Sequence, residues 1–150
     1  MSSSNIILAG NVNGLGWVRC EGKCSFMNSP KLKNWADEQL KAGVKHIVVD
    51  LETCTGMDST FMGTMAGIAM RLAKTTGGVL DIASASDKSR QSLEDLGLSS
   101  LMQINPKTPM WPNNAENIRA TLVEVGQTGS NDRTQHVFDA HKILCDADDN

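Results

Sequence analysis

Residues 45–51, with the sequence Lys-His-Ile-Val-Val-Asp-Leu, are the segment that most constrains how this chain folds. Their apolar residues stand side by side, whereas a strand with one solvated face alternates apolar and polar residues. We therefore expect a strand that is covered on both faces. Such a strand lies near the middle of a sheet with helices packed on it, which is the arrangement of an α/β domain.

Four segments have the residue spacing of amphipathic helices, in which apolar residues recur three and four positions apart. The second of them is the longest and contains no proline. The first begins with a cap residue followed by proline at the first helical position, which favours a helix start. The expected helices run from Asn28 to Gly43, over residues 59–75, from Ser86 to Gly97 and from Asn114 to Val125.

Four shorter apolar runs predict the remaining strands. The first two, residues 6–8 and 16–20, are separated by the turn signal Asn13-Gly14 and predict a β-hairpin. Residues 79–83 and 101–104 predict two more strands. This order of elements predicts an α/β fold, with a mixed β-sheet of four to five strands and helices packed on it.

The 150 residues are enough for one domain but leave little room for two hydrophobic cores. We expect this domain to span residues 1–126. Residues 127–133 have the composition of a linker, and the apolar residues at 137, 140 and 144 could form a further helix. We therefore expect residues 127–150 to be a polar linker and a C-terminal helix with an acidic tail.

Charge and hydrophobicity exclude several classes of protein. The formal net charge is −3, so the chain lacks the basic surface that binds nucleic acid. The longest apolar run near the N-terminus, residues 6–9, is too short for a signal peptide or a membrane-spanning helix. We expect a cytoplasmic protein with no direct membrane insertion and no nucleic-acid partner.

The cysteines and histidines do not predict a metal site. The four cysteines are expected to be reduced thiols, since no secretory signal accompanies them. Cys20 and Cys24 lie on one expected strand, where four residues span about 13 Å, too far for a disulfide or a shared zinc ion. On a helix, His136 and His141 would point about 140° away from each other.

The sequence motifs of common enzyme classes are missing. The chain has no glycine-rich phosphate loop, no Gly-x-Gly-x-x-Gly after a strand and no Gly-x-Ser-x-Gly elbow. No nucleophile with a matching base can be named. We therefore expect a protein that is not an enzyme, with no catalytic residues and no cofactor.

The segment Met57-Asp58-Ser59-Thr60 stands where a loop enters the longest expected helix. Ser59 is expected to cap this helix, because a serine oxygen can accept a hydrogen bond from an orphan backbone N–H. The same position, at the positive end of the helix dipole, also suits a phosphate group. Ser59 could therefore be an ordinary cap or a regulatory phosphorylation site, and Met57 and Met62 could offer an adaptable apolar surface or fill the core.

Two segments around Ser59 resemble a known protein family. Val48-Val49-Asp50-Leu51, a short loop, Met57-Asp58-Ser59-Thr60 and then Gly63 form a pattern similar to the STAS domains of anti-sigma factor antagonists. The resemblance covers roughly residues 17–104. It extends to residues with similar places in the family, namely Gly22, Ser29, Pro30, Leu32, Gly78, Leu93, Gly97 and Leu98.

The resemblance implies a regulatory function. In the family, the serine that matches Ser59 is phosphorylated by an anti-sigma factor that is itself a serine kinase, and a metal-dependent serine phosphatase reverses the reaction. The unphosphorylated antagonist binds the kinase and releases the sigma factor, so it regulates transcription indirectly. The resemblance thus implies a phosphorylation site at Ser59 and contacts with the kinase through Met57, Asp58, Thr60 and Met62.

The resemblance leaves two points open. Some STAS proteins suggest an alternative, in which the domain docks on a membrane transporter or a lipid-transport ATPase and Ser59 need not be phosphorylated. Two positions also differ from the usual family pattern, with Phe61 in place of a glycine and Ser25 in place of an aspartate. Phe61 could change the surface that the kinase contacts or pack inward, and its helical spacing with Met65 and Ile68 favours inward packing.

Overall fold

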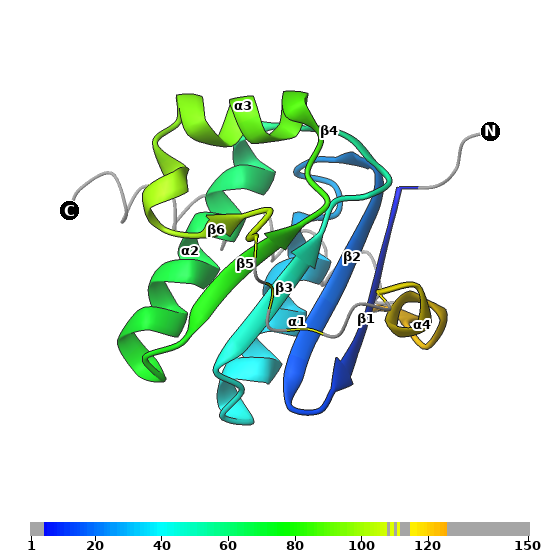
Figure 1. Cartoon of the computed structure of the whole chain (residues 1–150), viewed down its shortest axis with the longest axis vertical. Coiled ribbons are helices and arrows are strands. Elements are labelled where there is room, and N and C mark those ends of the chain that lie inside the picture. Colours follow the sequence, from blue (N-terminus) through cyan, green and yellow to red (C-terminus); the bar gives the residue numbers. More distant parts are fainter. Residues whose placement is uncertain (1–4, 108, 110, 112–114, 126–150) are drawn as a thin grey trace.

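The computed structural model describes residues 5–107, 109, 111 and 115–125, which form alternating strands and helices (Figure 1). The strands are β1 (Ile6–Val12), β2 (Leu15–Cys24), β3 (His46–Asp50), β4 (Cys54–Met57), β5 (Val79–Ala83), β6 (Gln103–Ile104) and β7 (Val123–Glu124). The helices are α1 (Ser29–Lys41), α2 (Ser59–Thr75), α3 (Asp87–Asp95) and α4 (Ala115–Ala120), with a short 3-10 helix at Leu98–Ser100.

All the described strands belong to one mixed sheet, in the order β6-β5-β3-β2-β1-β7, with β4 paired to the end of β2. Strands β2, β3, β5 and β6 are parallel to one another, whereas β1 is antiparallel to both β2 and β7. The α/β class and the mixed sheet are confirmed. The sheet contains two strands, β4 and β7, beyond the four to five that the sequence predicts.

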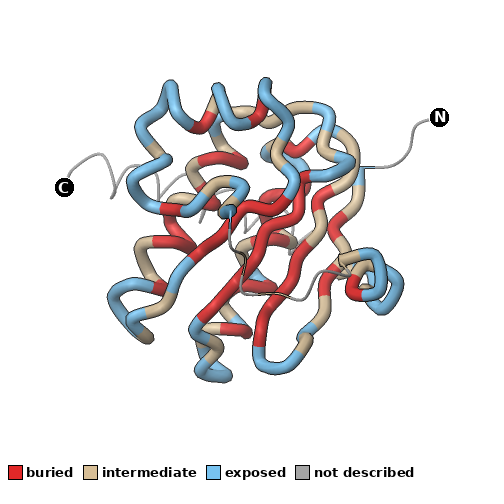
Figure 2. Tube along the Cα trace, in the orientation of Figure 1, coloured by how far each residue is buried: buried red, intermediate tan, exposed pale blue. Residues whose placement is uncertain are grey.

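Strand β3 lies in the middle of this sheet and is buried at every residue, so both of its faces are covered (Figure 2). On one face, strand residues such as Ile47 and Val49 join the large core cluster with residues of α1 and α2. On the other face, Trp17 and Val48 pack with Ile118 of α4. Figure 1 shows α1 and α2 together on the same side of the sheet. The central strand predicted from residues 45–51 is therefore confirmed.

The hairpin between β1 and β2 turns at Asn13 and Gly14. Their φ angles are 54° and 81°, so both central residues have the positive φ of a type I′ turn. The Asn-Gly pair favours this turn because asparagine and glycine tolerate the left-handed conformation. The predicted hairpin is confirmed, and its strands are longer than the apolar runs that indicated them.

The fourth helix is shorter than the sequence predicts. Helix α4 ends at Ala120, and Val123–Glu124 form strand β7, which pairs with Leu8 and Ala9 of β1. The Val125 N–H also donates to the Ile7 carbonyl at 2.8 Å. The expectation that the helix continues to Val125 is wrong, because backbone pairing with a strand from the other end of the sequence replaces the helical bonds.

Two further expectations concern the membrane and the C-terminal part. Within the described residues, no helix is both long enough and apolar enough to cross a membrane. The expected linker, helix and acidic tail of residues 127–150, and Asn114, where the fourth helix is expected to begin, lie outside the described residues.

Candidate functional site

The N-terminus of α2 is built around Asp58, which joins β4 to the helix. Asp58 has the extended backbone of an N-cap residue, and its Oδ1 accepts a hydrogen bond from the Phe61 N–H at 2.8 Å. Its Oδ2 accepts from the Phe26 N–H at 2.9 Å, and its own N–H donates to the Cys24 carbonyl at 3.0 Å. Asp58 therefore fixes the start of α2 and the segment after β2 against each other.

Ser59 is the first residue of α2, and it is exposed. The expectation that Ser59 caps the helix is wrong, because the Asp58 carboxylate fills that role one residue earlier. The Ser59 hydroxyl is thus not needed for the cap. It stands on the surface at the positive end of the dipole of a 17-residue helix.

The other residues expected at the site divide between surface and core. Met57 and Thr60 are partly exposed and flank Ser59 along the chain. Met62 is only 7% exposed and belongs to the core cluster, so its burial favours a role as core filler over contact with a partner. It lies beside Phe61, which is fully buried, as the helical spacing predicts. Of the residues expected at the site, Met57, Asp58, Ser59 and Thr60 therefore contribute to the surface.

Two residues of the site were not predicted from the sequence. Phe26 and Met27 follow β2 directly and are 48% and 52% exposed, although both are large and apolar. The bond from the Phe26 N–H to Asp58 Oδ2 holds them next to the start of α2. Their signal in the sequence is a pair of large apolar residues between an expected strand and an expected helix, where polar loop residues are common.

A pair of thiols lies in the two strands that carry this site. Cys24 ends β2 and is buried, and its Sγ lies 3.2 Å from Sγ of the partly exposed Cys54, the first residue of β4. The hydrogen bond with Cys24, followed by burial, raises the pKa of the Cys54 thiol above its usual range. The Cys20 thiol raises the pKa of Cys24, the contact with Cys54 lowers it, burial raises it again, and the net direction is upward.

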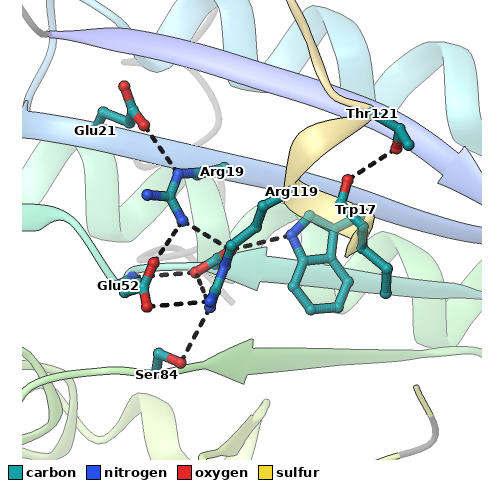
Figure 3. A network of polar contacts seen from close by, with 9 residues as sticks. Trp17, Arg19, Glu21, Glu52, Ser84, Arg119 and Thr121 are labelled. Carbon is teal, nitrogen blue, oxygen red and sulfur yellow. Dashed lines mark hydrogen bonds and ion pairs between the residues drawn. The ribbon is translucent and has the colours of Figure 1, made fainter. Parts of the chain in front are cut away.

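A charged network occupies the end of β3, on the side of the sheet that α4 covers. Asp50 is fully buried, and its carboxylate accepts hydrogen bonds from Trp17 Nε1 at 3.1 Å and from Arg119 Nε at 2.6 Å. A second Arg119 nitrogen donates to the other oxygen of Asp50 at 3.1 Å. Arg19 reaches the same carboxylate at 3.5 Å and also binds Glu52 at 2.8 Å (Figure 3).

This network is internally satisfied. Burial alone would lower the pKa of Arg19, but its hydrogen bonds to Glu21 and Glu52 and the charge of Asp50 outweigh burial and raise it. Arg119 completes the arrangement with a bond to Ser84 Oγ at 3.2 Å. The bonds of this network tie α4 to the loop after β3. Because its charges already have partners, the network does not offer a free charge to a ligand.

The face of the sheet that α4 covers also holds His46 of β3. Its Nε2 lies 2.8 Å from Oδ2 of Asp81 in β5. Both residues are buried. In the part of the chain that the structure describes, no group of three His, Cys, Asp or Glu residues has the geometry to hold a metal ion.

The comparison with known protein families decides the classification. The family model of the STAS domain matches residues 8–126. This chain belongs to the STAS domain family. The match spans nearly all of the described residues, including the Asp58–Ser59 site and the residues of the Asp50 network.

Solved structures of other proteins share the STAS fold. The protein TM1081 of Thermotoga maritima is 18% identical, with 75% of this chain and 91% of that chain covered and a TM-score of 0.60. An anti-sigma factor antagonist of Mycobacterium paratuberculosis is 18% identical, covers 80% and 97% of the two chains and has a TM-score of 0.59. SpoIIAA of Bacillus, in its phosphorylated form, is 18% identical, covers 75% and 96% and has a TM-score of 0.55. No curated protein sequence gives a significant match.

Proposed function

We propose that this STAS domain is an anti-sigma factor antagonist whose binding to an anti-sigma factor serine kinase is switched by phosphorylation of Ser59. The observation that carries the proposal is the division of roles at the start of α2. Asp58 supplies the cap, while the adjacent Ser59 is exposed. A kinase can therefore modify Ser59 without removing a bond that holds the helix.

The position of Ser59 also suits the phosphorylated product. The kinase would transfer the γ-phosphoryl group of its ATP to Ser59 Oγ, so the chemistry belongs to the partner and this chain supplies only the acceptor. A phosphoserine carries about −1.5 to −2 charges, and the N-terminus of a helix stabilises an anion. The carboxylate of Asp58 opposes this gain, but two backbone N–H groups already bind it.

The surface around Ser59 supports binding to a protein. Phe26 and Met27 expose apolar surface, and the partly exposed Met57 and Thr60 flank the serine. In the unphosphorylated form, a kinase could cover these residues together with the neutral hydroxyl. A phosphate placed among them would have to lose water in such an interface, so phosphorylation is expected to weaken binding.

Similar proteins supply a second line of support. A solved STAS structure from Mycobacterium paratuberculosis is described as an anti-sigma factor antagonist, and SpoIIAA of Bacillus has been solved in a phosphorylated and an unphosphorylated form. By analogy, a metal-dependent serine phosphatase would restore the free hydroxyl of Ser59. We place this regulation in the cytoplasm, with no enzymatic activity of the domain itself and no contact with nucleic acid.

The proposal is tested by incubating the purified chain with the cognate kinase and ATP and mapping the phosphate by mass spectrometry. We expect one phosphate on Ser59, none in Ser59→Ala, and full incorporation in the matched control Thr60→Val. Unchanged incorporation in Ser59→Ala would remove this residue from the role. Affinity capture of a transporter ATPase subunit without any serine kinase would overturn the switch as a whole.

A further inference from the structure

The contact between Cys24 and Cys54 has no role in the function proposed above. The two residues come from paired strands, since β2 and β4 are parallel with Gly22 opposite Cys54 and Cys24 opposite Met57. A register shift between Gly22 and Lys23 interrupts this ladder. The interruption coincides with the place where the two sulfur atoms lie 3.2 Å apart. Two thiols from separate segments therefore already face each other.

We propose that Cys24 and Cys54 are a redox modification site, at which a reversible disulfide joins β2 to β4 next to Ser59. A disulfide has an S–S length of about 2.0 Å, so the sulfur atoms must approach by about 1.2 Å from the 3.2 Å of the reduced pair. Cys54 is the first residue of β4, a strand of four residues.

The oxidant is a low-molecular-weight disulfide, such as glutathione disulfide. The more exposed Cys54 attacks one glutathione sulfur as a thiolate, forms a mixed disulfide and releases one glutathione. The Cys24 sulfur then attacks Cys54 and releases the second glutathione. The net reaction converts one protein dithiol and one glutathione disulfide into one protein disulfide and two glutathione thiols, so electrons and protons balance.

The reactive pair lies next to a surface cavity. The cavity has a volume of about 300 Å³ and is lined by residues that directly follow Cys54, namely Thr55, Gly56 and Met57, together with Lys23, Lys88, Ser89 and Ser92. Its two lysines favour the approach of an anion such as glutathione disulfide. The raised pKa of the Cys54 thiol keeps its thiolate scarce at neutral pH, so the reaction is expected to be slow.

The disulfide would clamp the two segments that present the site. Phe26 and Met27 follow Cys24 after one residue, and Met57 and Asp58 follow Cys54 after two. In the reduced form hydrogen bonds join these segments, among them those from the Asp58 N–H to the Cys24 carbonyl and from the Phe26 N–H to the Asp58 carboxylate. The regulatory meaning of such a clamp rests on the proposed function, whereas the disulfide itself does not.

The test equilibrates the purified full-length chain in glutathione buffers, from reducing to oxidising, in mildly alkaline solution to overcome the slow rate. Acid quenching, alkylation and peptide mass spectrometry then identify the linked cysteines. We expect a Cys24–Cys54 peptide and a rise in Tm of about 5–10 °C for a loop of this length. Amide exchange at Phe26 and Asp58 is expected to be slower in the oxidised form.

Two variants make the test specific. Cys20→Ala removes a buried thiol of the same strand and should leave the linked peptide and the rise in Tm unchanged, whereas Cys54→Ser should abolish both. Free thiols throughout the wild-type titration, or a linkage that involves Cys20 or a second chain, would overturn the inference. Ser59 phosphorylation is measured on the reduced chain, so the failure of the switch and the failure of the disulfide are distinguishable.

Discussion

At the scale of single residues, the carboxylate of Asp58 caps α2, so the Ser59 hydroxyl is not needed for the cap. The sequence predicts correctly that a helix begins at Ser59, but it names Ser59 as the cap in place of Asp58. Asp and Ser are both good N-cap residues, so two of them in sequence are ambiguous without coordinates. The second bond of Asp58, to the Phe26 N–H, comes from a distant segment, and no local pattern could have indicated it.

The replacement Asp58→Ala should destabilise the domain. It removes the helix cap and leaves the Phe26 N–H without its acceptor. We expect a loss of about 1–2 kcal/mol in the free energy of unfolding, measured by urea denaturation. The matched change Asp58→Asn should cost less, since asparagine caps helices nearly as well, and Ser59→Ala should stay within about 0.5 kcal/mol of wild type. A larger loss in Ser59→Ala than in Asp58→Ala would contradict the assignment of the cap.

The replacement Ser59→Asp should imitate the phosphorylated state only in part. A carboxylate suits the helix dipole but carries one charge, compared with about −1.5 to −2 for phosphoserine. We therefore expect the variant to bind the kinase about tenfold more weakly than wild type, a difference of about 1.4 kcal/mol, in isothermal titration calorimetry. Ser59→Ala serves as the control and should bind like wild type. Equal affinity of the Asp and Ala variants would show that charge at this position does not control binding.

At the scale of elements, the sequence predicts best those segments that carry their own signal. The bounds of α2 and β5 agree with the predicted ranges 59–75 and 79–83, because spacing and flanking glycines mark both. Strands β4 and β7 have four and two residues, too few for a periodic pattern. Strand β4 forms because β2 provides backbone hydrogen-bond partners for it, and β1 does the same for β7. These partners are in place only once the sheet has assembled.

Helix α4 should depend on Arg119 for its attachment to the sheet. Arg119→Ala removes the two hydrogen bonds to the buried carboxylate of Asp50 and leaves that charge with Trp17, Arg19 and the Glu52 N–H. Breaking a buried pair from one side costs about 3–5 kcal/mol, and the remaining partners should reduce this to about 2 kcal/mol in urea denaturation.

Two comparisons identify the cause of that loss. Arg119→Lys should recover only part of it, because an ammonium group cannot make both bonds of the guanidinium at once. Arg90→Ala breaks an ion pair with Asp87 in which both side chains are exposed, so it should change stability by less than about 0.5 kcal/mol. Equal losses in Arg119→Ala and Arg90→Ala would show that the Asp50 network does not hold α4.

At the scale of the whole molecule, the candidate site borders the core, and Met57 packs against the core cluster. Helices α1 and α2 fill one face of the sheet and α4 covers part of the other, whereas the exposed residues of the site lie where β2 and β4 end and α2 begins. The sequence predicts this division only in part. The sequence places Ser59 at the start of a helix, but it does not predict that Phe26 and Met27 are its apolar neighbours. These two residues follow β2, and the pairing of β2 with β4 that brings them close to Ser59 cannot be predicted from the sequence.

Phosphorylation of Ser59 should therefore change the surface and leave the fold intact. The phosphate gains about 0.3–1 kcal/mol from the helix dipole and loses a comparable amount to repulsion from Asp58, so the free energy of unfolding should change by less than about 1 kcal/mol. In a two-dimensional amide NMR spectrum of the phosphorylated chain, we expect shifts confined to residues 24–28 and 54–63. Treatment with phosphatase should restore the original spectrum. Shifts spread over β3, β5 and α4 would mean that the phosphate acts through the core, in which case the kinase would recognise a different fold and not a different surface.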